Sequence, residues 1–122
     1  MSELQREEML YDVVIVGAGP AGLATAIKLK QVNKDLSVCL LEKAAEVGAH
    51  ILSGNVFETK ALDELIPNWE SLDTPVNTKV SSEDFLFLSK DKSLKIPNFL
   101  LPRSLQNHGN YIISLSNLCK WL

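Results

Sequence analysis

The sequence predicts an α/β fold built around a parallel strand, helix and strand unit, and three observations support this. An apolar run at residues 13–16 leads into glycines at positions 17, 19 and 22. An amphipathic segment, residues 21–32, follows at once, and a second apolar run, residues 36–41, comes next. Two short apolar runs separated by one helix are typical of neighbouring parallel strands.

The glycines have the GxGxxG spacing in the string DVVIVGAGPAG, directly after the first predicted strand. Gly17 allows a tight turn, Gly19 brings no side chain against a pyrophosphate, and Gly22 lets the helix pack closely on the strand. An anion bound there would lie at the positive N-terminus of the helix. This context favours a Rossmann-like dinucleotide-binding turn over the alternative, an ordinary glycine-rich turn.

The elements of the unit have the expected patterns. The strand at residues 13–16 is β-branched, and we expect it to be buried on both faces. The helix at residues 21–32 has Lys28 and Lys30 on its wetter side. Its apolar stripe consists of Leu23, Ala26, Ile27 and Leu29. The strand at residues 36–41 then closes a right-handed βαβ unit.

Glu42 follows the second strand, twenty residues beyond Gly22. A carboxylate at this position faces the adenosine ribose of a bound dinucleotide and accepts hydrogen bonds from its hydroxyls. The same charge would repel a 2'-phosphate. The alternative interpretation is a solvated charge at a strand end.

The middle of the chain is less regular. Residues 43–57 are expected to form a loop that contains Gly48 and Gly54, and residues 59–66 a short helix stopped by Pro67. Residues 69–84 are polar and poorly periodic, which predicts connecting structure.

Residues 85–105 combine apolar side chains with a local positive charge. Four cations, Lys90, Lys92, Lys95 and Arg103, face one anion, Asp91, so the segment carries +3 within a chain of net charge −3. An apolar stretch too short to span a membrane and fringed by lysines suits the headgroup layer of an anionic membrane. The alternative is a buried hairpin in which FLFL and LKI pair across a KDKS turn.

The C-terminal stretch begins with a glycine and asparagine turn, followed by a strand at residues 111–113 and a helix capped by Ser114 or Ser116. One face of that helix is apolar: Leu115, Leu118, Trp121 and Leu122. No C-cap follows, and a doubly wound domain needs further strands. We therefore expect an N-terminal tail at residues 1–10 and a truncated nucleotide-binding domain at residues 11–122.

Composition narrows the classes of function. Binding of nucleic acid would call for a basic surface, and the net charge of −3 does not indicate one. Cys39 and Cys119 form no CxxC motif and have no histidine at the spacing of a metal site. They are interpreted as small buried hydrophobic residues. The acidic N-terminus does not resemble a transit peptide, and no apolar run is long enough to span a membrane.

Several strings together resemble one family. They are VVIVGAGPAGLATAIKLK, VCLLEKAAEVGAHILSG, ALDELIPNW and NHGNYI. The first resembles all glutathione-reductase-type FAD-binding domains, whereas AHILSG and NHGNY are much more specific. Residues 11–122 closely resemble the N-terminal part of electron transfer flavoprotein:ubiquinone oxidoreductase.

The resemblance implies site residues for FAD. Glu42 would bind the adenosine ribose and Lys43 would lie beside the adenine, while His50 and His108 are expected to be loop and turn residues. The pyrophosphate loop would consist of Gly17, Ala18, Gly19, Pro20, Ala21 and Gly22. The loop after the second strand would approach the pyrophosphate or the flavin with Gly48, Ser53 and Gly54.

The resemblance also implies a relay. Electrons would arrive from electron transfer flavoprotein, pass through a [4Fe-4S] cluster and FAD, and leave as ubiquinol. The enzyme would dock on the inner bacterial membrane, or on the mitochondrial inner membrane in a eukaryote, without spanning it. Docking is expected from Phe85, Phe87, Leu88, Ile96, Phe99, Leu100 and Leu101. Cys39 and Cys119 do not match the cluster ligands of this family. The 122 residues alone are therefore not expected to catalyse the reaction.

Three alternatives are open. A related FAD-dependent reductase, such as a geranylgeranyl-reductase-like protein, or a hydroxylase would share the glycine loop and Glu42 but lack the AHILSG and NHGNY strings. An NAD-dependent dehydrogenase fits less well, because GAGPAG followed by LLEK is more typical of FAD. The third is an inactive, truncated nucleotide-binding fragment.

Overall fold

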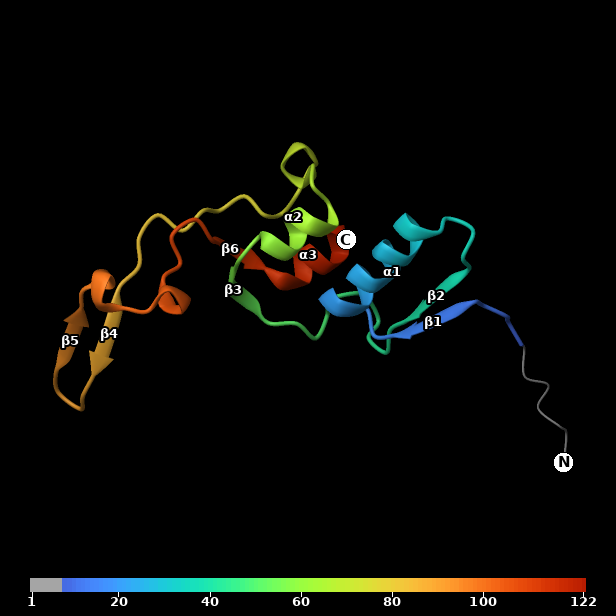
Figure 1. Cartoon of the computed structure of the whole chain (residues 1–122). Helices are drawn as coiled ribbons and strands as arrows, with labels where there is room; N and C mark the ends of the chain where they lie inside the picture. Colours follow the sequence, from blue (N-terminus) through green and yellow to red (C-terminus); the bar gives the residue numbers. More distant parts are fainter. Residues whose placement is uncertain (1–7) are drawn as a thin grey trace, which may run out of the picture.

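The computed structural model describes residues 8–122, in which three α-helices and three two-stranded sheets form (Figure 1). The predicted tail, residues 1–10, lies mostly outside this range. The first sheet pairs β1 (Val13–Val16) with β2 (Val38–Leu41), and α1 (Pro20–Val32) connects them. The pairing is parallel and in the register Val13 to Val38. The predicted βαβ unit is therefore confirmed.

Hydrogen bonds fix both ends of this sheet. At the start of the strands, the Asp12 carboxylate accepts from the backbone N–H of Ser37 at 2.8 Å and from its hydroxyl at 2.7 Å. These bonds hold the pKa of Asp12 below its usual range. At the far end the Gly17 N–H donates to the Leu41 carbonyl at 2.7 Å. The turn after β1 is thereby tied to the end of β2.

The expectation that β1 is buried on both faces is wrong. Burial alternates along the strand, and the side chains of Val14 and Val16 are 53% and 85% exposed. Ile15 faces the other way, toward Gly22 of α1. Within the described residues only α1 packs on this sheet, so the opposite face stays open to solvent.

A second unit contains the main hydrophobic core. Here β3 (Ser53–Phe57) pairs antiparallel with β6 (Tyr111–Ser114), beside α2 (Lys60–Leu65) and α3 (Leu115–Trp121). Its buried residues are Leu62, Trp69, Val76, Tyr111, Ile113 and Leu118. The predicted short helix and the strand followed by a helix at the C-terminal end are confirmed.

Two parts of this unit differ from the sequence predictions. Residues 53–57 form a strand rather than a loop, because β6 supplies a partner from far along the chain. Residues 69–84 are not merely connecting structure, since Trp69 and Val76 enter the core. The Trp69 indole N–H donates to Asp63 at 2.6 Å, and its ring meets the Tyr111 ring edge-on.

The last helix agrees closely with its prediction. Ser114 is the N-cap, and its hydroxyl accepts from the Asn117 N–H at 3.3 Å. The predicted apolar face packs on the core: Leu115, Leu118, Trp121 and Leu122. Cys119 is buried as expected, and burial raises the pKa of its thiol, whereas Cys39 is half-buried.

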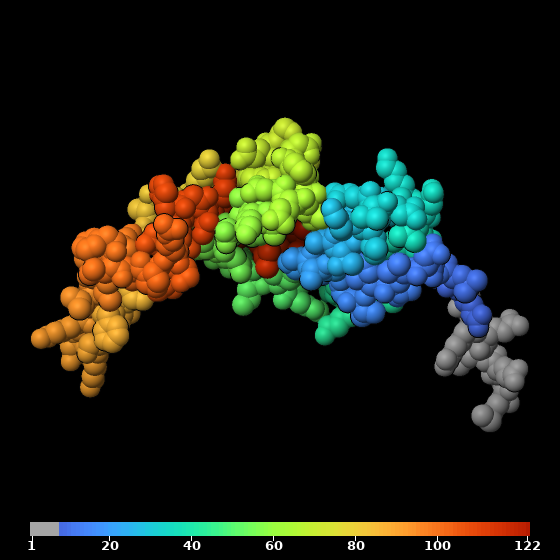
Figure 2. All heavy atoms as spheres, viewed as in Figure 1, coloured from blue at the N-terminus to red at the C-terminus, as the bar shows by residue number. Residues whose placement is uncertain are grey.

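A separate arm extends from the second unit. It consists of β4 (Phe85–Leu88) and β5 (Ser93–Ile96), an antiparallel hairpin at one end of the elongated molecule (Figures 1 and 2). The hairpin is as the sequence predicted, but it is exposed rather than buried. The accessible surface of 9751 Å² is about half as large again as that of a compact domain of this mass.

Candidate nucleotide-binding site

The turn between β1 and α1 presents an open helix N-terminus. Gly17 has a φ of +103°, a conformation that other residues rarely adopt. Gly19 is the N-cap of α1 and no side chain caps the helix, while Pro20 occupies the first turn. The first turn also carries no acidic side chain. Its free N–H groups and the helix dipole therefore favour an anion at this end.

Gly19 and Gly22 have different surroundings. A Cβ atom added to Gly19 would meet no atom within 4 Å, whereas one added to Gly22 would lie 2.0 Å from the Gly17 carbonyl oxygen. The same atom on Gly22 would lie 3.3 Å from Ile15 Cγ2. Gly22 therefore serves the packing of helix on strand, and Gly19 leaves open space in front of the loop. Both features match the geometry that a pyrophosphate needs.

Glu42 joins the end of β2 to the glycine turn. One carboxylate oxygen accepts from the Ala18 N–H at 2.8 Å, and the other accepts from the Ala44 N–H at 2.8 Å. These two bonds, the Ala44 bond first, hold the pKa of Glu42 below its usual range. Glu42 is thus ionised at neutral pH and adjacent to the turn, at the carboxyl ends of both parallel strands. The bond to Ala18 was missed by sequence reasoning, because no spacing rule reports it.

The other predicted cofactor residues are placed differently. Lys43 is exposed beside Glu42. Gly48 is buried, and an added Cβ would lie 2.7 Å from the Ser116 hydroxyl oxygen, so packing against α3 already requires this glycine. Ser53 and Gly54 lie in β3, where the register shifts between Ser53 and Asn55 and Gly54 has a φ of +81°. These three residues have structural roles of their own.

The two histidines lie outside the core. His50 is exposed in the loop before β3, and His108 is exposed in the turn before β6. Their positions agree with the predicted loop and turn. In residues 8–122 no group of three or more potential metal ligands comes together.

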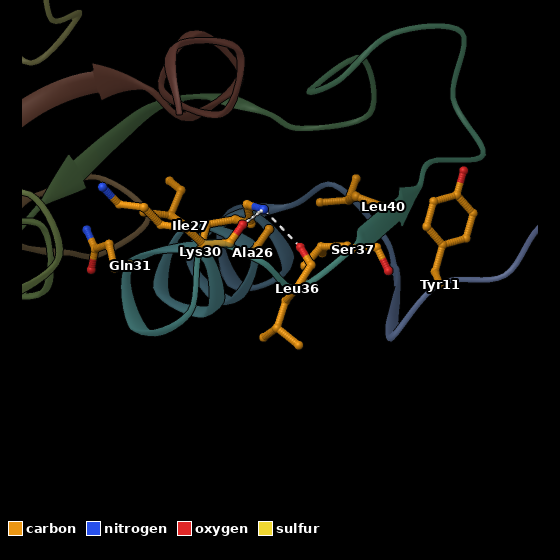
Figure 3. A pocket seen from close by; sticks show the side chains of 10 residues that line it. Tyr11, Ala26, Ile27, Lys30, Gln31, Leu36, Ser37 and Leu40 are labelled. Carbon is orange, nitrogen blue, oxygen red and sulfur yellow. Dashed lines mark hydrogen bonds between the residues drawn. The ribbon is translucent and has the colours of Figure 1, made fainter.

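One apolar hollow of the structure does not coincide with this site. It is open, holds about 710 Å³, and lies between the C-terminal half of α1 and the start of β2 (Figure 3). Lys30 crosses its edge and donates to the Leu36 carbonyl at 2.9 Å. Ligands of such sheets bind at the carboxyl ends of the strands, and those ends lie at Gly17 and Glu42 and not at this hollow.

The predicted docking residues mostly face solvent. Phe87 is 65% exposed and Phe99 is 82% exposed. Phe85, Leu88 and Leu100 are also exposed, and Ile96 is half-buried. Leu101 is 9% exposed, so the expectation that it lies on the docking surface is wrong.

The charge of the arm is smaller than its sequence suggests. Lys95 forms an ion pair with Asp84 at 2.5 Å, and Asp84 lies just before the segment 85–105. The other charged side chains of this segment are three cations, Lys90, Lys92 and Arg103, and one anion, Asp91. The segment therefore keeps a positive excess. Across the described part of the chain, the longest helices are too short or too polar to cross a bilayer.

Comparison with known proteins agrees with this geometry. Residues 15–84 match the family described as an NAD(P)-binding Rossmann-like domain. The electron transfer flavoprotein-ubiquinone oxidoreductase of Pseudomonas aeruginosa is 55% identical over 98% of this chain and 22% of its own length. The mitochondrial proteins of that name from Oryza sativa and Rattus norvegicus are 58% and 47% identical, over 96% and 91% of this chain.

The chain spans about a fifth of the length of these relatives. The glycine turn, Glu42, α1 and β2 lie within the residues matched by this family, as does the second half of β1. The sequence-based resemblance and the Rossmann-like fold are both confirmed. The chain belongs to the NAD(P)-binding Rossmann-like family, and its curated homologues are electron transfer flavoprotein-ubiquinone oxidoreductases.

Proposed function

We propose that this chain forms the ADP-binding part of an FAD site in an oxidoreductase that passes electrons from reduced electron transfer flavoprotein to ubiquinone. The observation that carries the proposal is the position of Glu42, hydrogen-bonded to Ala18 beside an open glycine turn. The names of the relatives support the donor and the acceptor. Residues 11–122 would then be one part of the flavin domain.

The proposed contacts follow from the turn. The N–H groups at the start of α1 would hold the pyrophosphate in the space in front of Gly19. Glu42 would accept hydrogen bonds from the ribose hydroxyls, through the carboxylate lone pairs that are not used by the Ala18 and Ala44 N–H groups. Lys43 would lie near the adenine. When bound, FAD supplies the redox chemistry, and these residues supply binding and orientation.

The glycines of the neighbouring loop have a secondary place in the proposal. Gly48, Ser53 and Gly54 could only shape the route toward the flavin, because their own packing and strand pairing already account for them. The described residues do not provide ligands for a [4Fe-4S] cluster, since Cys39 and Cys119 lie in separate units. We assign no step through a cluster to this chain.

We further propose that the arm docks on an anionic membrane surface. Its apolar side chains are exposed on both faces of β4 and β5, and an isolated two-stranded hairpin is marginally stable in water. Its positive excess complements the anionic lipids of such a surface. The location would be the inner bacterial membrane, or the mitochondrial inner membrane in a eukaryote.

The cofactor proposal is tested by Gly19→Val in the natural full-length protein. The extended backbone at Gly19 and the empty space around it accept valine, so the fold should survive while the side chain occupies the place of the pyrophosphate. We expect flavin content, measured by absorbance, to fall to near zero. Thr25→Val, at an exposed position on α1, is the matched control. Full flavin occupancy in Gly19→Val would contradict the proposed site.

A further inference from the structure

The NHGN turn before β6 forms a hydrogen-bonded network with Glu83. The Glu83 carboxylate accepts from the backbone N–H of Asn107 at 2.9 Å and from its side-chain amide at 2.7 Å. The Asn107 side-chain oxygen in turn accepts from the Asn110 amide at 3.3 Å. Gly109 completes the turn with a φ of +89°. The network therefore has an ionised acceptor at its centre, which makes its bonds the strong kind.

This network closes the base of the arm. On the core side of the network, the chain that leaves the core runs beside β6. There the Val80 N–H donates to the Asn110 carbonyl at 2.9 Å, and the Ile112 N–H donates to the Thr78 carbonyl at 2.8 Å. On the other side of the network lie β4 and β5. Glu83 is the outgoing residue and Asn107 the returning one, 24 positions later. The two segments are thus joined at the point where the arm begins (Figure 1).

A second bond ties the arm itself to this point. The Asn98 side-chain amide donates to the Glu83 carbonyl at 3.2 Å. Asn98 belongs to the turn that follows β5, so Glu83 holds both the base of the arm and its far strand. Contacts between the hairpin and the core are few, because β4 and β5 pair with each other and with no other strand in residues 8–122.

We propose that Glu83 and Asn107 act as positioning residues that fix the direction of the arm relative to the nucleotide-binding unit. The inference rests on the proposed membrane docking, which it deepens. A hairpin on two extended segments would swing freely if its base were not closed. With the base closed, one defined side of the hairpin meets the membrane while the cofactor site keeps a constant orientation to it. The NHGNY string is thereby explained by the arm and not by the cofactor.

The test is the distance between the arm and the nucleotide-binding unit in the natural full-length protein. Spin labels carried by unnatural amino acids in place of Lys92 and Lys34, both exposed, report this distance by pulsed electron paramagnetic resonance and leave every cysteine unchanged. Glu83→Gln removes the charge and one acceptor, and we expect the distance distribution to broaden about twofold or more. Glu70→Gln, an exposed carboxylate away from the arm, is the control and should leave it narrow. Asn107→Ala is the second variant and should act like Glu83→Gln.

A narrow distribution in both Glu83→Gln and Asn107→Ala would overturn the inference. Loss of hydrogen-exchange protection throughout β4 and β5 in these variants would also overturn it, because the network would then stabilise the fold of the hairpin and not its direction. A second measurement, binding to vesicles of phosphatidylcholine with phosphatidylglycerol, tests the docking proposal separately from the direction of the arm. Vesicle binding should change less than about threefold in Glu83→Gln, since the apolar side chains are unchanged. Failure of the unmodified protein to bind vesicles would refute docking, whatever the distances show.

Discussion

Replacing Gly22 with alanine tests the packing of the nucleotide turn. The added Cβ would lie 2.0 Å from the Gly17 carbonyl oxygen and 3.2 Å from the Gly17 carbonyl carbon. Ordinary contacts lie near 3.5 Å, so α1 or the turn must move by roughly 1 Å or more. Overpacking of this kind costs about 1–3 kcal/mol, and alanine returns about 0.5–1 kcal/mol in helix propensity. We expect a net loss of about 1–2 kcal/mol.

The assay is urea unfolding of the natural full-length protein, followed by circular dichroism, with FAD affinity measured in parallel. Gly22→Ala should lower both the unfolding midpoint and the affinity, because displacement of Gly17 disturbs the turn. Gly19→Ala is the matched control, since its Cβ meets no atom within 4 Å. Its stability should stay within about 0.5 kcal/mol of the unmodified protein. Equal or greater stability of Gly22→Ala, or a larger loss in Gly19→Ala, would refute the reasoning.

Two further outcomes are expected. Phe87→Ser removes a side chain that is 65% exposed on the arm, and its loss from a membrane is worth about 1–2 kcal/mol, so vesicle binding should fall about 5- to 30-fold. Val32→Ser, on α1, should leave vesicle binding unchanged, and equal losses in both variants would contradict a specific arm. Ser37→Ala removes a bond that lowers the pKa of Asp12 in the folded state. That stabilisation is present above the unfolded pKa and is lost as the pH falls through the lower folded-state pKa. The variant should therefore be less stable at pH 7, and the difference from the unmodified protein should shrink only as the pH falls below about 4.

Local patterns predicted the nucleotide unit well. The glycine spacing, the apolar runs and Glu42 all act over short distances in the sequence, and the structure brings Gly17 and Glu42 together at one sheet edge. The hairpin was also predictable, because its two strands are separated by a short polar turn. Ser114 was predictable as a cap from its residue type and position.

The remaining features depend on distant parts of the chain. The pairing of β3 with β6 joins residues 54 to 61 positions apart, and nothing local in residues 53–57 reveals it. Trp69 and Val76 stand in a polar stretch without periodicity, so their burial follows only from the core around them. Burial of β1 on both faces was expected from its composition, but it needs a second covering layer that the described residues do not supply. The Glu83 network was missed because Asn107 reads locally as turn chemistry.

The measurement that tests the central claim most directly is the identity of the cofactor in the purified natural full-length protein. The protein should be released from its ligand by denaturation, and the ligand identified by chromatography and mass. We expect FAD at about one molecule per chain, and we expect the Gly19→Val variant to contain none. NAD(P) in place of FAD, or FAD retained in that variant, would contradict it.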